Sequence, residues 1–207
     1  MIDNGNHIAM LSLGDSYTIG EGVAEHERWP GQLAAALRDE GIPVAPPYII
    51  ARTGWTTDEL DAAIDAAGIT GNYGLVTLLI GVNNQYRGRS VDEYREQFDA
   101  LLQRAIGFAG GRADRVLALS IPDWGVTPFA ADSGRDTRHI ARDIDAYNAT
   151  AGQCCKARDV AWVDITFATR MRDAARMLVA DGLHPSAEMY AQWTALALPE
   201  ARRLLTA

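Results

Sequence analysis

Short apolar runs alternate with longer segments of helical periodicity along this sequence. Five of the runs have the length of a strand: Ile8–Leu13, Tyr48–Ala51, Leu75–Ile80, Val116–Ser120 and Val160–Asp164. The third and fourth are almost continuously apolar, which is typical of strands that helices cover on both faces, so we expect them in the middle of a sheet. The alternation predicts repeated βαβ units and therefore an α/β fold with a parallel sheet.

The segments between these runs have clear helix start and stop signals. Helices are predicted over Trp29–Glu40, Thr57–Ala67, Val91–Gly107, Thr137–Ala157 and Ser186–Leu205, with a shorter one near Thr169–Ala175. Capping residues followed by acids mark two of the starts, and glycines mark the ends. The longest segment without a clear period is Asp123–Thr137, which predicts a loop that forms a binding wall or lid.

Length and charge limit the class of protein. The 207 residues are enough for one sizeable core, so a single domain over residues 1–207 is expected. A net charge of −8 leaves no basic stripe to bind a phosphate backbone, which argues against a nucleic-acid partner. No run is long enough to predict a membrane span, and no feature of the sequence indicates an oligomeric state.

The first residues and the cysteines suggest an ordinary cytoplasmic protein. The seven residues before the first apolar run contain no Lys or Arg, so the positive region of a signal peptide is missing and a cytoplasmic location is expected. Cys154 and Cys155 are adjacent in a predicted helix and lack the spacing of a metal site, so we interpret them as packing residues. No metal or organic cofactor is expected.

Four unusual loops follow predicted strands. Gly14-Asp15-Ser16 ends the first, Arg52-Thr53-Gly54-Trp55 follows the second, Gly81-Val82-Asn83-Asn84 ends the third, and Asp181-Gly182-Leu183-His184 lies between the last strand and the last helix. In an open parallel sheet the ligand crevice lies beyond the carboxyl ends of the strands. These loops are therefore expected on one rim of the sheet.

Ser16 is predicted at a strand-to-helix turn. A serine hydroxyl at such a turn is exposed above the sheet. It becomes a nucleophile only if a base is nearby, because it is almost un-ionised at neutral pH. Asp181 and His184 are three positions apart in a Gly/Pro-punctuated loop, a spacing that lets the carboxylate orient the imidazole. Taken alone, Ser16 would be interpreted as a helix-capping serine, which is a frequent use of this residue.

At these positions the sequence resembles the SGNH hydrolases, the GDSL-type esterase and lipase superfamily. Four blocks match in the family's order: Gly14-Asp15-Ser16, Gly54, Gly81-Val82-Asn83 and Asp181-Gly182-Leu183-His184-Pro185. The resemblance implies a flavodoxin-like, three-layer α/β/α sandwich with about five parallel strands. It also implies that Ser16 is the nucleophile, that His184 is the general base, and that Asp181 holds the imidazole in its productive tautomer.

The same resemblance implies an oxyanion hole made of the backbone N–H groups of Ser16 and Gly54 and the side-chain amide of Asn83. One departure is Asn84, because the family commonly has Asp there. This change is expected to alter the bracing of the loop or the choice of substrate.

Four side chains near these blocks are candidates for a substrate pocket. Tyr86 and Arg87 follow the third block and are hypothesised to grip an acid or sugar, and Trp124 and Phe129 are candidates for the wall of an acyl or sugar pocket. All four residue types also serve commonly in packing.

The leading hypothesis is a serine ester hydrolase that acts on a small-molecule ester, with acetyl or another short acyl group, through an acyl-enzyme. A thioesterase or lysophospholipase of the same superfamily is the alternative within this chemistry. From another class, a flavodoxin-like mononucleotide-binding module remains open, although the first loop lacks a P-loop lysine and a full G-x-G-x-x-G, and Asp15 would repel an anion. A catalytically silent binding module is a third alternative, for which Asn84 is the only hint.

Overall fold

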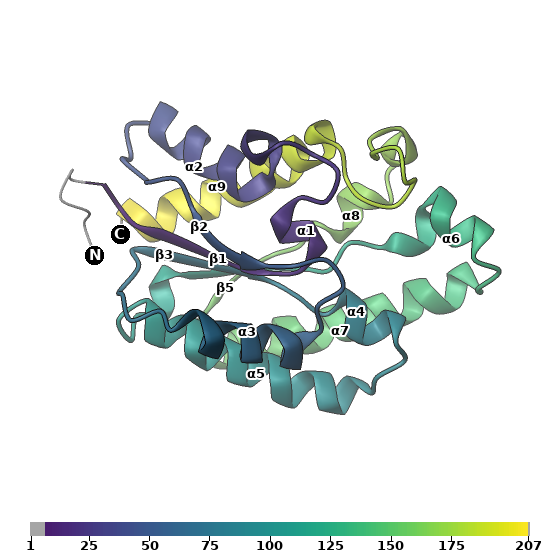
Figure 1. The fold of residues 1–207 in the computed structure, drawn as a ribbon, viewed down its shortest axis with the longest axis horizontal. Coiled ribbons are helices and arrows are strands. Elements are labelled where there is room, and N and C mark those ends of the chain that lie inside the picture. The colour runs from purple at the N-terminus through teal and green to yellow at the C-terminus, as the bar shows by residue number, and fades with distance from the viewer. Residues whose placement is uncertain (1–6, 207) are drawn as a thin grey trace.

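The computed structural model describes residues 7–206, and at its centre is a sheet of five parallel strands (Figure 1). The strands are β1 (Met10–Gly14), β2 (Tyr48–Ala51), β3 (Leu75–Leu79), β4 (Val116–Leu119) and β5 (Ala161–Val163). They are arranged in the order β2-β1-β3-β4-β5, and every neighbouring pair is parallel. The predicted α/β fold with a parallel sheet is confirmed.

Helices cover both faces of the sheet. The helices are α1 (Ser16–Ile19), α2 (Trp29–Asp39), α3 (Thr57–Ala67), α4 (Val82–Tyr86), α5 (Val91–Phe108), α6 (Pro128–Asp132), α7 (Thr137–Ala157), α8 (Thr166–Thr169) and α9 (Ala187–Thr206). Figure 1 shows α1, α2, α8 and α9 on one face and α3, α4, α5 and α7 on the other, which is the three-layer sandwich. Within residues 7–206, no helix combines the length and apolarity needed to cross a membrane.

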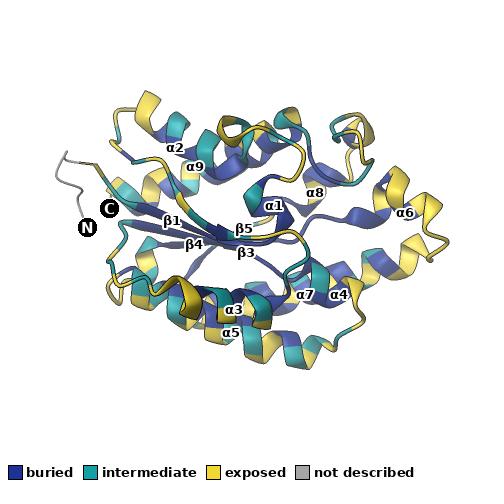
Figure 2. Cartoon of the chain, in the orientation of Figure 1, coloured by how far each residue is buried: buried dark blue, intermediate teal, exposed yellow. Residues whose placement is uncertain are grey.

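Burial explains the order of the strands. Every residue of β1, β3 and β4 is buried, and these are the three central strands (Figure 2). The edge strand β2 is only partly buried, and its Tyr48 side chain is exposed. Continuous apolar runs therefore occupy the middle of the sheet because helices bury them on both faces.

Two sequence-based expectations need correction. The first strand begins at Met10 and not at Ile8, because Ile8 makes only an isolated bridge to Val44. The short helix expected near Thr169–Ala175 is wrong: α8 ends at Thr169, and a separate 3₁₀ turn covers Ala174–Arg176. The Thr169 hydroxyl accepts a hydrogen bond from the backbone N–H of Asp123, so Thr169 is bound to the loop that follows β4.

The strand order reverses between β1 and β3. The chain places β2 on one side of β1 and then returns to place β3 on the other. Gly14, the last residue of β1, is in register with Ala51 of β2 and Leu79 of β3, so the three following loops leave the sheet at one level. This reversal is the place where open α/β sheets form their ligand crevice.

Helix α1 starts immediately after β1 because the strand ends in glycine. A Cβ at Gly14 would lie 2.2 Å from the Thr18 Oγ1 atom and 2.5 Å from the Leu79 carbonyl oxygen. Both distances are far below van der Waals contact, so only glycine lets α1 pack this closely over the end of β3. Asp15 then caps the helix by accepting a hydrogen bond from the Tyr17 backbone N–H at 3.0 Å.

Asp15 is fully buried, and its second carboxylate oxygen, Oδ2, has no hydrogen-bond partner among the described residues. Burial raises the pKa of Asp15 to about 7, although the hydrogen bond from Tyr17 acts in the opposite direction. The folded protein thus keeps a proton that the unfolded chain releases between about pH 4 and pH 7. The contribution of the Asp15 carboxyl group to the free energy of unfolding therefore falls as pH rises through that window.

We predict that Asp15→Asn becomes more stable relative to the wild type as pH rises. The amide keeps the acceptor for Tyr17 but removes the ionisation, so the difference in free energy of unfolding should grow by as much as roughly 4 kcal/mol between pH 4 and pH 8. Urea unfolding of both proteins at the two pH values measures this change. A difference that does not depend on pH would mean that Asp15 is already ionised in the folded protein at pH 4.

Candidate active site

A cavity of about 230 Å³ opens beyond the carboxyl ends of β1 and β3. Its walls come from the loops after β1, β2 and β3, from the segment that contains α6, and from the loop before α9. The lining residues are Ser16, Tyr17, Thr53, Gly54, Val82, Asn83, Tyr86, Trp124, Phe129, Leu183 and His184. The reversal of strand order thus brings sequence-distant polar groups into one cavity.

Ser16 is the first residue of α1 and is buried at the floor of this cavity. Asp15 accepts the neighbouring backbone N–H groups: its side chain binds that of Tyr17, and its carbonyl oxygen binds those of Thr18 and Ile19. The first N–H groups of a helix have no partner within the helix. Among residues 7–206 the Ser16 N–H therefore remains available at the cavity, without a protein acceptor.

Asp181 and His184 are joined directly. The Asp181 Oδ2 and His184 Nδ1 atoms are 2.6 Å apart, and Asp181 Oδ1 accepts the backbone N–H groups of Leu183 and His184 at 2.8 and 2.9 Å. Burial acts to raise the pKa of Asp181, but the hydrogen bonds from the imidazole and the two N–H groups outweigh it and lower the pKa. The carboxylate therefore stays ionised beside the imidazole.

The His184 loop is held from both sides. The His184 carbonyl oxygen accepts a hydrogen bond from the Val179 N–H at 2.9 Å, and Pro185 forms an antiparallel bridge with Leu178. The Tyr17 ring packs on the imidazole with centroids 5.7 Å apart. Since Tyr17 follows Ser16 directly, this contact couples the placement of the imidazole to that of the serine.

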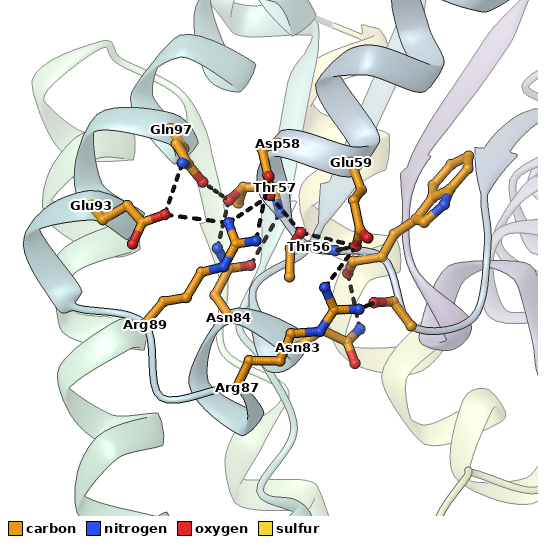
Figure 3. Close-up of polar contacts among 12 residues, drawn as sticks. Thr56, Thr57, Asp58, Glu59, Asn83, Asn84, Arg87, Arg89, Glu93 and Gln97 are labelled. Atoms are coloured by element: carbon orange, nitrogen blue, oxygen red, sulfur yellow. Dashed lines mark hydrogen bonds and ion pairs between the residues drawn. The ribbon is translucent and has the colours of Figure 1, made fainter.

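Gly54 and Asn83 face the cavity from neighbouring loops. The Asn83 Nδ2 group donates to the Trp55 carbonyl oxygen at 2.9 Å and has a second hydrogen to give (Figure 3). Within the described residues, the Gly54 backbone N–H has no protein acceptor. Ser16, Gly54 and Asn83 therefore line the cavity, and each carries an N–H hydrogen without a protein acceptor within residues 7–206.

Asn84 is fully buried behind the cavity and does not line it. Its Oδ1 atom accepts the Thr57 N–H at 3.1 Å, and its Nδ2 group donates to the Thr57 hydroxyl at 2.6 Å (Figure 3). The Thr57 hydroxyl in turn donates to Gln97. An amide can both accept and donate here without burying a charge, which explains how Asn replaces the family's usual Asp at this position.

Three of the four residues predicted for a substrate pocket line the cavity. Tyr86 packs edge-on against Trp124 with centroids 5.2 Å apart, and Trp124 lies 6.2 Å from Phe129. The Trp124 indole N–H donates to Gln85 Oε1 at 2.8 Å, which fixes the ring. Tyr86 and Phe129 each keep more than a third of their surface exposed, so they form an aromatic rim at the mouth.

Arg87, the fourth pocket candidate, does not line the cavity. Its Nη2 group donates to the Gly54 carbonyl oxygen at 2.7 Å, and its Nη1 group pairs with Glu59 Oε2 at 3.2 Å (Figure 3). Both ends of the guanidinium thus bind the chain behind the cavity wall.

Sequence reasoning missed several residues at the site. Tyr17, Thr53 and Leu183 line the cavity, and their only sequence signal was that each adjoins a predicted site residue. Arg135 gave no signal, yet its guanidinium stacks over Tyr86 at 4.0 Å from the ring centroid and donates to the Tyr86 carbonyl oxygen at 2.9 Å. It joins the segment that contains α6 to α4 and so closes the aromatic rim.

A second, narrower apolar cavity of about 20 Å³ lies next to the first. Tyr17, Trp124 and Leu183 line both cavities and form the wall between them. Within residues 7–206, no cluster of three His, Cys, Asp or Glu side chains is arranged to hold a metal ion.

Solved structures with the same fold were found over nearly the whole chain. TesA is 20% identical with a TM-score of 0.73, and the match covers 95% of this chain and 99% of that one. The lipase/acylhydrolase from Enterococcus faecalis is 18% identical with a TM-score of 0.72, covering 95% and 96%. Axe2, an acetylxylan esterase from Geobacillus stearothermophilus, is 19% identical with a TM-score of 0.69, covering 94% of both chains. At these identities the likeness establishes the fold.

No curated protein matches the sequence significantly. Residues 12–192, which are most of the chain, match the GDSL-like Lipase/Acylhydrolase family. This match favours the hydrolase prediction over the mononucleotide-binding alternative. The protein therefore belongs to the GDSL-like lipase/acylhydrolase family and is a carboxylic ester hydrolase.

Proposed function

We propose that the protein hydrolyses small acyl esters through an acyl-enzyme, with Ser16, His184 and Asp181 as its catalytic residues. The observation that carries this proposal is the 2.6 Å contact between Asp181 and an imidazole that lines the same cavity as Ser16. A carboxylate at Nδ1 keeps that nitrogen protonated, which leaves Nε2 as the basic atom of the ring. Such an imidazole suits a general base.

In the first half of the reaction, the Ser16 hydroxyl attacks the ester carbonyl carbon while His184 takes its proton. The tetrahedral intermediate collapses when the C–O bond to the leaving alcohol breaks, and His184 returns the proton to that oxygen. In the second half, water attacks the carbonyl carbon of the acyl-enzyme and gives a proton to His184. The C–O bond to Ser16 then breaks, His184 returns that proton to the Ser16 oxygen, and the carboxylic acid leaves. Asp181 stays ionised throughout and stabilises the imidazolium.

The negative charge on the carbonyl oxygen needs hydrogen-bond donors. The N–H groups of Ser16 and Gly54 and the Asn83 amide fit this requirement, because these residues line the cavity and each keeps an N–H hydrogen that has no protein acceptor in the described part of the chain. One such donor contributes roughly 3 kcal/mol to the transition state. The oxyanion hole thus draws on the loops after three adjacent strands.

The size of the cavity supports short acyl groups as substrates. Its 230 Å³ lies below the roughly 300–1,000 Å³ of pockets for drug-sized ligands. Beyond Leu183 there is space for little more than one water molecule, so a long acyl chain cannot extend in that direction. The structural likeness to acetylxylan esterase Axe2 agrees with an acetyl ester, and the exposed Tyr86 and Phe129 rings provide an apolar surface for the leaving group.

We expect the purified protein to release p-nitrophenol from p-nitrophenyl acetate and a fluorophosphonate to label Ser16, as shown by peptide mass spectrometry. Ser16→Ala should lose both the labelling and at least a thousandfold of the turnover, because no other group supplies the nucleophile. Ser90→Ala, which removes an exposed hydroxyl at the N-cap of α5 and outside the cavity lining, is the matched control and should keep both. Labelling at another serine would refute the assignment.

Asp181→Asn should lower kcat by roughly a hundredfold or more while KM stays nearly constant. The variant keeps an oxygen for the Leu183 and His184 N–H groups, but its amide favours the wrong tautomer of the imidazole. Steady-state kinetics and thermal unfolding measure the two effects separately. A large loss of thermal stability with unchanged turnover would show that Asp181 is only a structural residue of the loop.

Leu183→Ala should join the two cavities and shift the preference toward longer acyl chains. We expect the ratio of kcat/KM for p-nitrophenyl hexanoate to that for the acetate to rise roughly tenfold, which is the value of about one or two methylene groups in an apolar pocket. The ratio cancels any general damage to the neighbouring His184. A ratio equal to that of the wild type would place the acyl group elsewhere.

A further inference from the structure

Residues of the loop after β2 and of the start of α3 are bound by side chains from α4 and the turn that follows it (Figure 3). Asn83 donates to the Trp55 carbonyl oxygen, Asn84 exchanges two hydrogen bonds with Thr57, Arg87 donates to the Gly54 carbonyl oxygen, and Arg89 pairs with Asp58 at 2.6 Å. These contacts join the loop that contains Gly54 to the segment that contains Asn83, and both residues are proposed donors of the oxyanion hole. We call this set of contacts the interloop clamp.

We propose that Arg87 is a positioning residue that holds the backbone of Gly54 in the conformation needed for the Gly54 N–H to bind the oxyanion. This inference rests on the proposed function, since it assigns a role to Arg87 within the same reaction. It replaces the sequence-based hypothesis that Arg87 grips the substrate.

Gly54 is the residue of the oxyanion hole that most needs to be held. Its φ of +87° lies in the region that favours glycine, and glycine has access to negative φ almost as readily. It has no side chain that could pack and select one conformation. A change of φ and ψ at this residue would turn the adjacent N–H away from the cavity.

Anchors lie on both sides of Gly54. Before it, the Thr53 hydroxyl donates to Glu21, and after it, the Trp55 N–H donates to the Arg52 carbonyl oxygen at 3.2 Å. Arg87 is the side chain that binds the Gly54 carbonyl oxygen itself, at 2.7 Å. A charge-assisted bond to that oxygen fixes the plane of the following peptide and therefore limits ψ of Gly54.

Glu59 keeps the guanidinium in place for this task. Its Oε2 atom pairs with Arg87 and also accepts the Thr56 N–H at 2.9 Å, in the capping box of α3. Both charged side chains of the pair keep about two fifths of their surface exposed, so the ion pair adds little to overall stability. A planar guanidinium can bind the carbonyl oxygen and the carboxylate at once, which an ammonium group does less well.

The test compares Arg87→Gln and Arg87→Lys with Arg104→Gln. Arg104 is the matched control because it also bridges to α3, through Asp61 at 2.7 Å and Asp65 at 2.6 Å, but it lies outside the cavity lining and the interloop clamp. For p-nitrophenyl acetate we expect kcat to fall roughly 10- to 100-fold in Arg87→Gln, up to the value of one oxyanion donor. KM should change less than about threefold, since ground-state binding is not affected.

A second readout separates positioning from damage to the fold. A trifluoromethyl ketone forms a tetrahedral oxyanion on Ser16, so its inhibition constant should rise in Arg87→Gln by the same factor as kcat/KM falls. Arg87→Lys should be intermediate in both, and Arg104→Gln should match the wild type in both. Thermal unfolding should show all three variants folded at the assay temperature.

Three results would overturn the inference. One is an Arg87→Gln enzyme with wild-type kcat and KM, and another is an equal loss of kcat in Arg104→Gln. The third is an Arg87→Gln enzyme with a raised KM at constant kcat, which would instead make Arg87 a substrate contact. A wild-type protein that neither hydrolyses the ester nor is labelled at Ser16 is a different outcome, because it would refute the proposed function itself.

Discussion

The parallel register of β1, β2 and β3 is the constraint on which the rest of the structure depends. Because Gly14 is paired with Ala51 on one side and with Leu79 on the other, three loops leave the sheet at one level around the point where the strand order reverses. Ser16, Gly54 and Asn83 sit in those loops and face one cavity. The fourth element, the His184 loop, reaches the same cavity because α9 packs against α2, on the face of the sheet that α1 also covers (Figure 1).

The two carboxyl groups near this cavity have pKa values that are shifted in opposite directions. Asp181 is ionised and bound to His184, whereas the carboxyl group of Asp15, next to the proposed nucleophile in sequence, is buried and has its pKa raised to about 7. A second carboxylate beside Ser16 would oppose the oxyanion that the reaction forms. Behind the cavity, the interloop clamp uses Asn84 to join α4 to α3 without a buried charge.

Much of this arrangement was predictable from local patterns. The continuous apolar runs of the central strands indicated burial on both faces, and the order of the motif blocks indicated which loops converge. The Asp181–His184 pair was predictable because its two members are three residues apart in one loop, where the backbone alone brings them together. The boundaries of the first strand and the short helix near Thr169 were wrong, since long-range contacts to Val44 and Asp123 decide them.

The direction of the Arg87 side chain was not predictable from local sequence patterns. Its neighbour Tyr86 lines the cavity, but Arg87 binds Gly54 and Glu59, which lie more than twenty residues earlier in the chain. Arg135 likewise reaches Tyr86 only through the tertiary fold. The sequence by itself determined the α/β class, the parallel sheet and the identity of the polar blocks, because periodicity and short spacing are local properties. Only the tertiary structure decided which side chains face the cavity and which brace it, because a side chain's direction depends on partners that lie far away along the chain.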